Sequence, residues 1–117
     1  MKTYKVAIIA DVEMVGDDPH PPALTTVVRP NFVVGQHYCV CFVLGTTPAD
    51  GIAMHGQGAF EASVVCTEDA LPLFVKGGRF ELRSAKRVFA TGDLREIVSV
   101  NEAAQSPGEG PGARTCQ

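Results

Sequence analysis

The chain has 117 residues, 45% hydrophobic and 20% charged, and its formal net charge at pH 7 is −3. This length suits one domain, which buries roughly two-thirds of the surface that its unfolded chain exposes. The negative balance argues against a protein that binds DNA or an anionic membrane through its overall charge. No apolar run approaches the ~20 residues that a membrane-spanning helix needs.

The N-terminal segment lacks the features of a secretory signal. A basic start is followed by a short apolar run over residues 6–10, and then by Asp11 and Glu13. A signal peptide needs a longer apolar region and a cleavage site after it. We therefore expect a cytoplasmic protein with reduced thiols, although an even number of cysteines also permits disulfides. The cysteines are Cys39, Cys41, Cys66 and Cys116.

Residues 3–14 predict the first strand. Apolar side chains occupy every second position from Tyr4 to Met14, and this period of two is typical of a half-buried strand. The following residues, 16–22, contain three prolines and two aspartates, which predicts a loop.

Two further strands are predicted over residues 24–34 and 37–44. Pro30 must lie at a strand start or an edge, because proline lacks an N–H donor. In the segment 37–44 we expect the larger apolar side chains to face the core, and these are Tyr38, Val40, Phe42 and Leu44. The opposite face then carries His37, Cys39, Cys41 and Val43.

The second half of the chain continues this pattern. Residues 45–58 are rich in glycine and predict a long loop. Residues 59–67 predict a strand with inward-facing Phe60, Ala62, Val64 and Cys66. The segment 71–98 predicts a short strand, a Gly-Gly turn, a strand with Phe80 and Leu82 inward, and a closing strand. A turn or bulge is expected in that last strand, at Thr91-Gly92-Asp93.

No segment has the 3.6-residue period of a helix. Six or seven short strands, separated by glycine and proline turns, indicate a closed barrel or a sandwich. From residue 102 the chain contains no large apolar residue. We therefore expect a β-barrel domain over residues 1–101 and a disordered, flexible tail rich in glycine and proline over residues 102–117.

Several short motifs follow one another in a recognisable order. An Arg-Pro pair opens a strand within residues 28–32, and a Met-x-Gly element occupies residues 54–56. A proline-containing linker then leads to an Arg-Phe strand with a second arginine, over residues 79–83. This order, spread over residues 3–100, resembles the C-terminal, third domain of elongation factor Tu. The resemblance implies a six-stranded antiparallel, Greek-key-like barrel that docks onto other domains and onto an exchange factor.

The sequence departs from that family in its functional parts. It contains no phosphate-binding loop of the form G-x-x-x-x-G-K-[ST], and the GTPase and middle domains have no counterpart. The family's Gly-Arg-x-Thr-Pro loop, which meets tRNA, is replaced by residues 17–22, which lack the arginine. The resemblance therefore implies a stand-alone binding domain.

The most prominent candidate site is basic. Six of the ten Lys and Arg residues fall within residues 76–95: Lys76, Arg79, Arg83, Lys86, Arg87 and Arg95. Aligned on neighbouring strands, they would form a patch able to contact RNA phosphates or an acidic protein surface. The alternative is a solvated outer face that Glu81, Asp93 and Glu96 partly neutralise. No aromatic residues lie at outward positions between these cations, so base stacking is not indicated.

The other candidate binding or metal-ligating residues are the three histidines together with Cys39 and Cys41. His37, Cys39 and Cys41 share a strand face, but side chains two residues apart stand about 6.6–7 Å from each other, whereas Zn–S bonds are about 2.3 Å. We therefore expect no metal and no cofactor. His20, among prolines, and His55, in the glycine-rich loop, are included as binding residues because loops often carry function.

These observations predict a non-catalytic binding module rather than an enzyme, with another protein as its partner. Structured RNA, either tRNA or rRNA, is the alternative partner. A small enzyme acting through the glycine-rich loop is the remote alternative. The basic segment and the loops 16–22 and 45–58 are the surfaces expected to bind.

Overall fold

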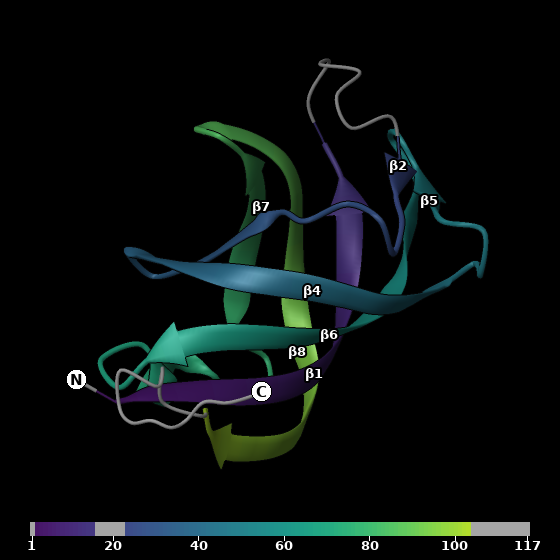
Figure 1. Ribbon diagram of the computed structural model, residues 1–117. Helices are drawn as coiled ribbons and strands as arrows, with labels where there is room; N and C mark the ends of the chain where they lie inside the picture. Colours follow the sequence, from purple (N-terminus) through teal and green to yellow (C-terminus); the bar gives the residue numbers. More distant parts are fainter. Residues whose placement is uncertain (1, 16–22, 104–117) are drawn as a thin grey trace.

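The computed structural model describes residues 2–15 and 23–103 and shows an all-β protein with one short 3₁₀ helix (Figure 1). Six strands form a closed antiparallel barrel in the order β1-β6-β4-β3-β7-β8, and β8 pairs with β1 to close it. They are β1 (Thr3–Met14), β3 (Asn31–Val34), β4 (His37–Thr47), β6 (Gln57–Thr67), β7 (Arg79–Ser84) and β8 (Arg87–Glu102). The predicted six-stranded antiparallel barrel is confirmed.

The connections explain the Greek-key-like character of the barrel. Strands β3, β4 and β6 follow one another in the chain and lie side by side, and β1 lies beside the last of them. A separate two-stranded sheet pairs β2 (Ala23–Leu24) with β5 (Ile52–Ala53). Among the described residues, no helix is long and apolar enough to cross a membrane.

The barrel interior is built from alternate residues of each strand, as expected for a pleated strand with one buried face. The predicted inward sets of β1 and β6 are confirmed except for Tyr4, which is only partly buried. Phe32 stacks between Phe74 and Phe80, with ring centroids 5.6 and 4.6 Å away. Phe60 meets the edge of Phe80 at 6.0 Å. These four rings fill the centre of the barrel.

The prediction of which β4 side chains face the core is wrong. Cys39, Cys41 and Val43 are buried, whereas Tyr38, Val40 and Leu44 are 55%, 53% and 61% exposed. Pairing decides this, because Cys41 lies opposite the buried Val64 of β6. A shift of one residue moves every side chain of a strand to the other face. Both faces of β4 carry apolar residues, so the alternation could not choose between them.

Two predicted segments have a different local structure. Residues 24–34 are not one strand, because a turn that includes the exposed Val27 separates β2 from β3. Pro30 directly precedes β3, at a strand start as predicted. The predicted loop 45–58 is shorter, since β4 continues to Thr47 and β5 lies within it.

The predicted short strand after residue 70 is the 3₁₀ helix η1, Leu71–Leu73, which has a proline in its first turn. The prediction of an extended strand there was wrong. The chain then turns at Gly77, whose φ of +85° suits glycine, and enters β7. Phe80 and Leu82 face the core as predicted.

Strand β8 is continuous through Thr91-Gly92-Asp93, so no turn interrupts it there. Its register shifts lie elsewhere: against β1 between Ala7 and Ile8 and between Ile9 and Ala10, and against β7 between Leu82 and Arg83. β8 ends at Glu102, and the Ala103 N–H donates to the Thr3 carbonyl at 2.8 Å. Residues 104–117, most of the predicted tail, lie outside the described residues.

Gly92 occupies the tightest position in the barrel wall. A Cβ atom there would lie 2.1 Å from the backbone oxygen of Asp11 and 2.6 Å from the Phe80 ring. Neither group is a flexible side-chain end, so the strands could not adapt without moving apart. The glycine is therefore required by close approach of three strands.

We expect Gly92→Ala to destabilise the protein by about 3 kcal/mol or more, because the added methyl overpacks the wall. Gly45→Ala is the matched control, since its Cβ would meet only the Glu61 Oε1 atom at 3.9 Å. Urea unfolding of both variants measures the difference. Equal stabilities would contradict the packing described at Gly92.

Candidate binding surfaces

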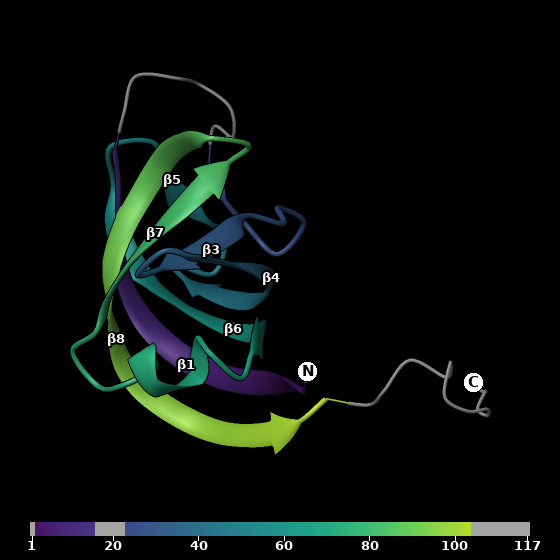
Figure 2. The ribbon, with the colours of Figure 1, turned by 90° about the vertical axis from the view of Figure 1, so that its left-hand side faces the viewer.

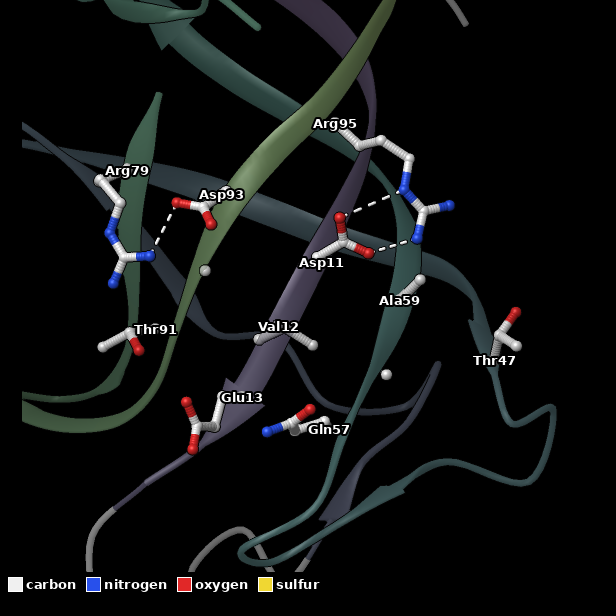
Figure 3. Close-up of a pocket in the computed structure, with 12 residues that line it drawn as sticks. Asp11, Val12, Glu13, Thr47, Gln57, Ala59, Arg79, Thr91, Asp93 and Arg95 are labelled. Atoms are coloured by element: carbon white, nitrogen blue, oxygen red, sulfur yellow. Dashed lines mark hydrogen bonds and ion pairs between the residues drawn. The ribbon is translucent and has the colours of Figure 1, made fainter. Parts of the chain in front are cut away.

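A depression of about 600 Å³ lies on the outer face of the barrel, where β7, β8, β1 and β6 run side by side (Figure 3). We call it the charged groove. Its floor consists of small residues and backbone, at Val12, Gly58, Ala59 and Gly92. Its polar walls are formed by Asp11, Glu13, Thr47, Gln57, Arg79, Thr91, Asp93 and Arg95.

The strand register explains why opposite charges meet in this groove. Asp11 and Asp93 lie directly opposite each other across β1 and β8, an arrangement that alone would be repulsive. Arg79 is directly opposite Asp93 on β7, and its Nη1 atom donates to Asp93 Oδ1 at 2.7 Å. Arg95 binds Asp11, with its Nε atom 3.2 Å from Oδ2. Each carboxylate is therefore neutralised by its own arginine.

The ion pair between Arg95 and Asp11 also changes the pKa of the arginine. Hydrogen bonding to the Asp11 carboxylate raises the pKa of the Arg95 guanidinium above its usual value. The guanidinium therefore keeps its positive charge near neutral pH.

Glu13 and Gln57 form the other end of the charged groove. They lie opposite each other across β1 and β6, and Thr91 of β8 is opposite Glu13. Figure 3 shows both side chains below the two ion pairs. Neither makes a side-chain hydrogen bond or ion pair with another residue of the described ranges. This end can therefore accept hydrogen bonds at the carboxylate and donate or accept them at the amide.

A second surface is apolar and lies on the outside of β4. We call it the β4 strip, and it consists of Tyr38, Val40, Phe42 and Leu44. Three of these side chains are more than half exposed. Val65 of β6 lies opposite Val40 and is only partly buried, so the apolar surface extends onto the neighbouring strand.

Two arginines lie over the aromatic rings of the β4 strip. The Arg29 guanidinium carbon is 5.1 Å from the Phe42 ring centroid, and that of Arg83 is 5.4 Å from the Tyr38 centroid. The Arg83 Nη1 atom also donates to the Tyr38 hydroxyl at 2.5 Å. These distances suit cation–π attraction. The two arginines thus fix the Phe42 and Tyr38 rings and form a basic rim beside the β4 strip.

The structure does not gather the predicted basic residues into one patch. Arg79, Arg83 and Arg95 are each bound to a carboxylate, those of Asp93, Glu81 and Asp11 respectively. The hydrogen bond to Glu81 raises the pKa of Arg83. Lys76 precedes β7, whereas Lys86 and Arg87 follow it, so the strand separates them by about 20 Å.

The two candidate histidines lie elsewhere. His55 is exposed in the turn between β5 and β6, where it adopts a positive φ of 65°. It does not belong to the charged groove or to the β4 strip. His20 and the rest of the predicted loop 16–22 lie outside the described residues.

The three cysteines among the described residues are buried and form no disulfide. Burial raises the pKa of the Cys39 thiol to about 11 and that of Cys41 to about 12, and it also raises the pKa of Cys66. The thiols are therefore protonated near pH 7 and act as small core residues. Within residues 2–15 and 23–103 no three His, Cys, Asp or Glu residues lie close enough to hold a metal ion.

The sequence matches no protein-family model, and a search of curated proteins finds no significant match. The charged groove and the β4 strip were both missed by sequence reasoning. The apolar residues of β4 were noticed but assigned to the core. The opposition of Asp11 and Asp93 left no local signal, because the two residues are 82 positions apart in the sequence.

The buried thiols predict a loss of stability in alkali. In the folded protein the pKa values of Cys39 and Cys41 exceed the ordinary thiol value of 9.0, so the unfolded chain loses these protons first as the pH rises. Stability is then fully present below pH 9 and is lost between pH 9 and about 12. We expect Cys41→Ala to lose less stability than the unmodified protein between pH 8 and pH 11, by about 1 kcal/mol or more. Urea unfolding at both pH values measures this, and equal losses would contradict it.

Proposed function

We propose that this barrel is a non-catalytic protein-binding module, and that the β4 strip is its docking face. The observation that carries the proposal is the exposure of Tyr38, Val40 and Leu44 on one strand face of a folded barrel. Single exposed apolar residues are ordinary on protein surfaces, but a contiguous apolar strip indicates an interaction site. Aromatic residues at such a site supply large contact area with little loss of side-chain entropy.

The basic residues at the rim of the β4 strip favour a partner that carries acidic residues. Arg29 lies over Phe42 and forms no ion pair within the described part of the chain. Lys5 of β1 lies opposite Val65 and is exposed. A partner with an apolar centre and carboxylates around it would complement this surface, because opposite charges at a rim speed association and reject wrong partners.

The resemblance to the third domain of elongation factor Tu supports the same proposal. That domain docks onto other domains and onto an exchange factor, and we infer that this barrel, which resembles it, likewise acts by docking. As part of this proposal we assign the module to the cytoplasm and to a process connected with translation. The unpaired thiols of Cys39, Cys41 and Cys66 are typical of a reducing compartment.

We expect Val40→Lys to weaken partner capture at least tenfold, because it places a charge in the centre of the docking face. Val75→Lys is the matched control, since Val75 is also 53% exposed but lies in the turn after η1. Affinity capture from native cytosol, followed by quantitative mass spectrometry, compares the two variants with the unmodified protein. Thermal unfolding checks that both variants remain folded. Equal capture by Val40→Lys would contradict the proposal.

Binding of tRNA or rRNA is the second candidate function, and the tip of the β7–β8 hairpin favours it. Lys86 and Arg87 are adjacent and exposed there, next to Ala85, which adopts a left-handed φ of 57°. The tip therefore presents two cations on a tight turn that protrudes from the barrel (Figure 2).

If this tip binds RNA, affinity for a labelled tRNA or rRNA fragment should fall steeply with salt. Changing Lys86 and Arg87 to Ala should reduce the slope of log K against log salt by about 1.4, because two phosphate contacts are lost. The matched double variant changes Lys2 and Lys5, at the end of the β1–β8 pair far from the hairpin tip, to Ala. No binding at low salt, or the same slope in both variants, would exclude the RNA function.

A further inference from the structure

Two of the buried cysteines face each other across neighbouring strands. Cys39 lies near the start of β4 and Cys66 near the end of β6, and these strands run side by side (Figure 1). The last pair of their ladder at this end joins Val40 to Val65. Because the strands are antiparallel, the next position along them sets Cys39 opposite Cys66. Both side chains lie on the inner face and are only 5% and 3% exposed.

The backbone hydrogen bonds determine how near these two cysteines lie. The Glu68 N–H donates to the Lys2 carbonyl at 3.2 Å, and hydrogen-bonded pairs alternate with non-hydrogen-bonded pairs along an antiparallel ladder. Cys66, which lies opposite Tyr4, therefore directs its N–H and C=O groups to β1 and away from β4. Cys39 and Cys66 thus meet at a non-hydrogen-bonded position, where opposite Cα atoms are about 4.5 Å apart.

This spacing suits a disulfide, which needs Cα atoms about 4.4–6.8 Å apart and Cβ atoms about 3.5–4.5 Å apart. Opposite Cβ atoms in a sheet are about 4.5–5.5 Å apart, and they are closer at non-hydrogen-bonded positions. The two side chains therefore need to approach each other only slightly. The pairing of β4 with β6 ends at Val40 and Val65, so this approach breaks no pair between the two strands.

Cys41 shares the inner face but has no cysteine opposite it. It lies opposite Val64 and is fully buried. Relative to Cys41, Cys66 is the diagonal neighbour, and diagonal neighbours are about 7–8 Å apart. Cysteines with Cα atoms more than about 7 Å apart cannot be bridged without backbone movement. The geometry therefore selects Cys39 and Cys66 from the three buried thiols.

The protonation of these thiols is consistent with this arrangement. The pKa of Cys39 is raised to about 11, chiefly by burial and also by the charge of the neighbouring Cys66 thiolate. The second cause acts only between groups that lie near each other. A protonated thiol is a poor nucleophile, so both side chains remain reduced until an oxidant reaches them.

We propose that Cys39 and Cys66 form an intramolecular disulfide when the protein meets a low-molecular-weight disulfide such as oxidised glutathione. One protein thiolate attacks the small disulfide, which forms a mixed disulfide and releases one small thiol. The other protein thiolate attacks the protein sulfur of the mixed disulfide, and a second small thiol leaves. Two electrons and two protons thereby pass from the protein thiols to the small disulfide. This modification does not depend on the proposed docking role of the β4 strip.

The test incubates the folded full chain with oxidised glutathione at mildly alkaline pH. Peptide mapping by mass spectrometry then identifies the cysteines that are joined. We expect an intramolecular bridge between Cys39 and Cys66, with the loss of two hydrogen atoms from the chain. A bridge that joins Cys41 or Cys116 in place of these two, a mixed disulfide that does not close, or thiols that all stay free would overturn the proposal.

Single variants separate this pair from the other buried thiol. Cys39→Ala should lose the intramolecular bridge, whereas the matched control Cys41→Ala should form it as completely as the unmodified protein. If Cys39→Ala does not fold, Cys66→Ala serves in its place, and the mapping of the unmodified chain requires no variant. An intramolecular bridge in Cys39→Ala, or its absence from folded Cys41→Ala, would contradict the assignment.

Oxidation should also stabilise the barrel, because the bridge joins residues 27 positions apart in the sequence and restricts the unfolded chain. We expect the thermal midpoint of the oxidised protein to lie about 5 °C or more above that of the reduced protein. A dithiol reductant should reverse this shift. An oxidised midpoint equal to or below the reduced one would show that the bridge strains the two strands, and the proposed geometry would then be rejected.

Discussion

The antiparallel pairing of β8 with β1 is the constraint on which the rest of the barrel depends. These are the two longest strands, and their pairing is the step that turns an open sheet into a closed one. Closure brings β7, β8 and β1 so near to one another that only glycine fits at position 92. It also leaves the aromatic stack of Phe32, Phe74 and Phe80 in the middle of a shared interior. Strand edges that closure covers cannot pair with other chains.

The same pairing produces the charged groove on the outside. It sets Asp11 opposite Asp93, and the arginines at 79 and 95 compensate that repulsion. Ion pairs of exposed side chains stabilise a fold little, so this groove is better understood as a consequence of closure than as its cause. Arg79 and Arg95, which the sequence predicted to contact RNA or an acidic protein surface, are in this way engaged with the protein's own carboxylates.

Although the barrel is closed, one of its strands is paired on both sides over only part of its length. Because β7 is short, the last part of β8 has a neighbour on one side only among the described strands. The β4 strip is an apolar outer face on another part of the barrel, where β4 lies between β6 and β3. The barrel therefore leaves an apolar strip exposed on β4 and part of the β8 backbone without a neighbour among the described strands. Both fit a binding module, and neither requires a reaction centre.

The sequence by itself determined the strands whose two faces differ. In β1, Val6, Ile8 and Val12 are buried, and the residues between them are exposed or only partly buried. The inward set was predicted correctly except for Tyr4, because the charged residues Lys5, Asp11 and Glu13 mark the other face as the outer one. The same holds for Phe60 and Val64 of β6 and for Phe80 of β7. The barrel class followed from the number and spacing of such strands. These features depend on neighbours in the chain, which a sequence displays.

Only the tertiary structure decided the facing of β4, the partners of the arginines and the open edge of β8. Cys41 rather than Phe42 is buried because β6 presents Val64 to it, and that register depends on residues more than twenty positions away. The opposition of Asp11 and Asp93 depends on barrel closure, which joins opposite ends of the chain. How far β8 extends beyond the end of β7 likewise depends on which residues of the two strands pair. Such relations arise between strands, and no local pattern encodes them.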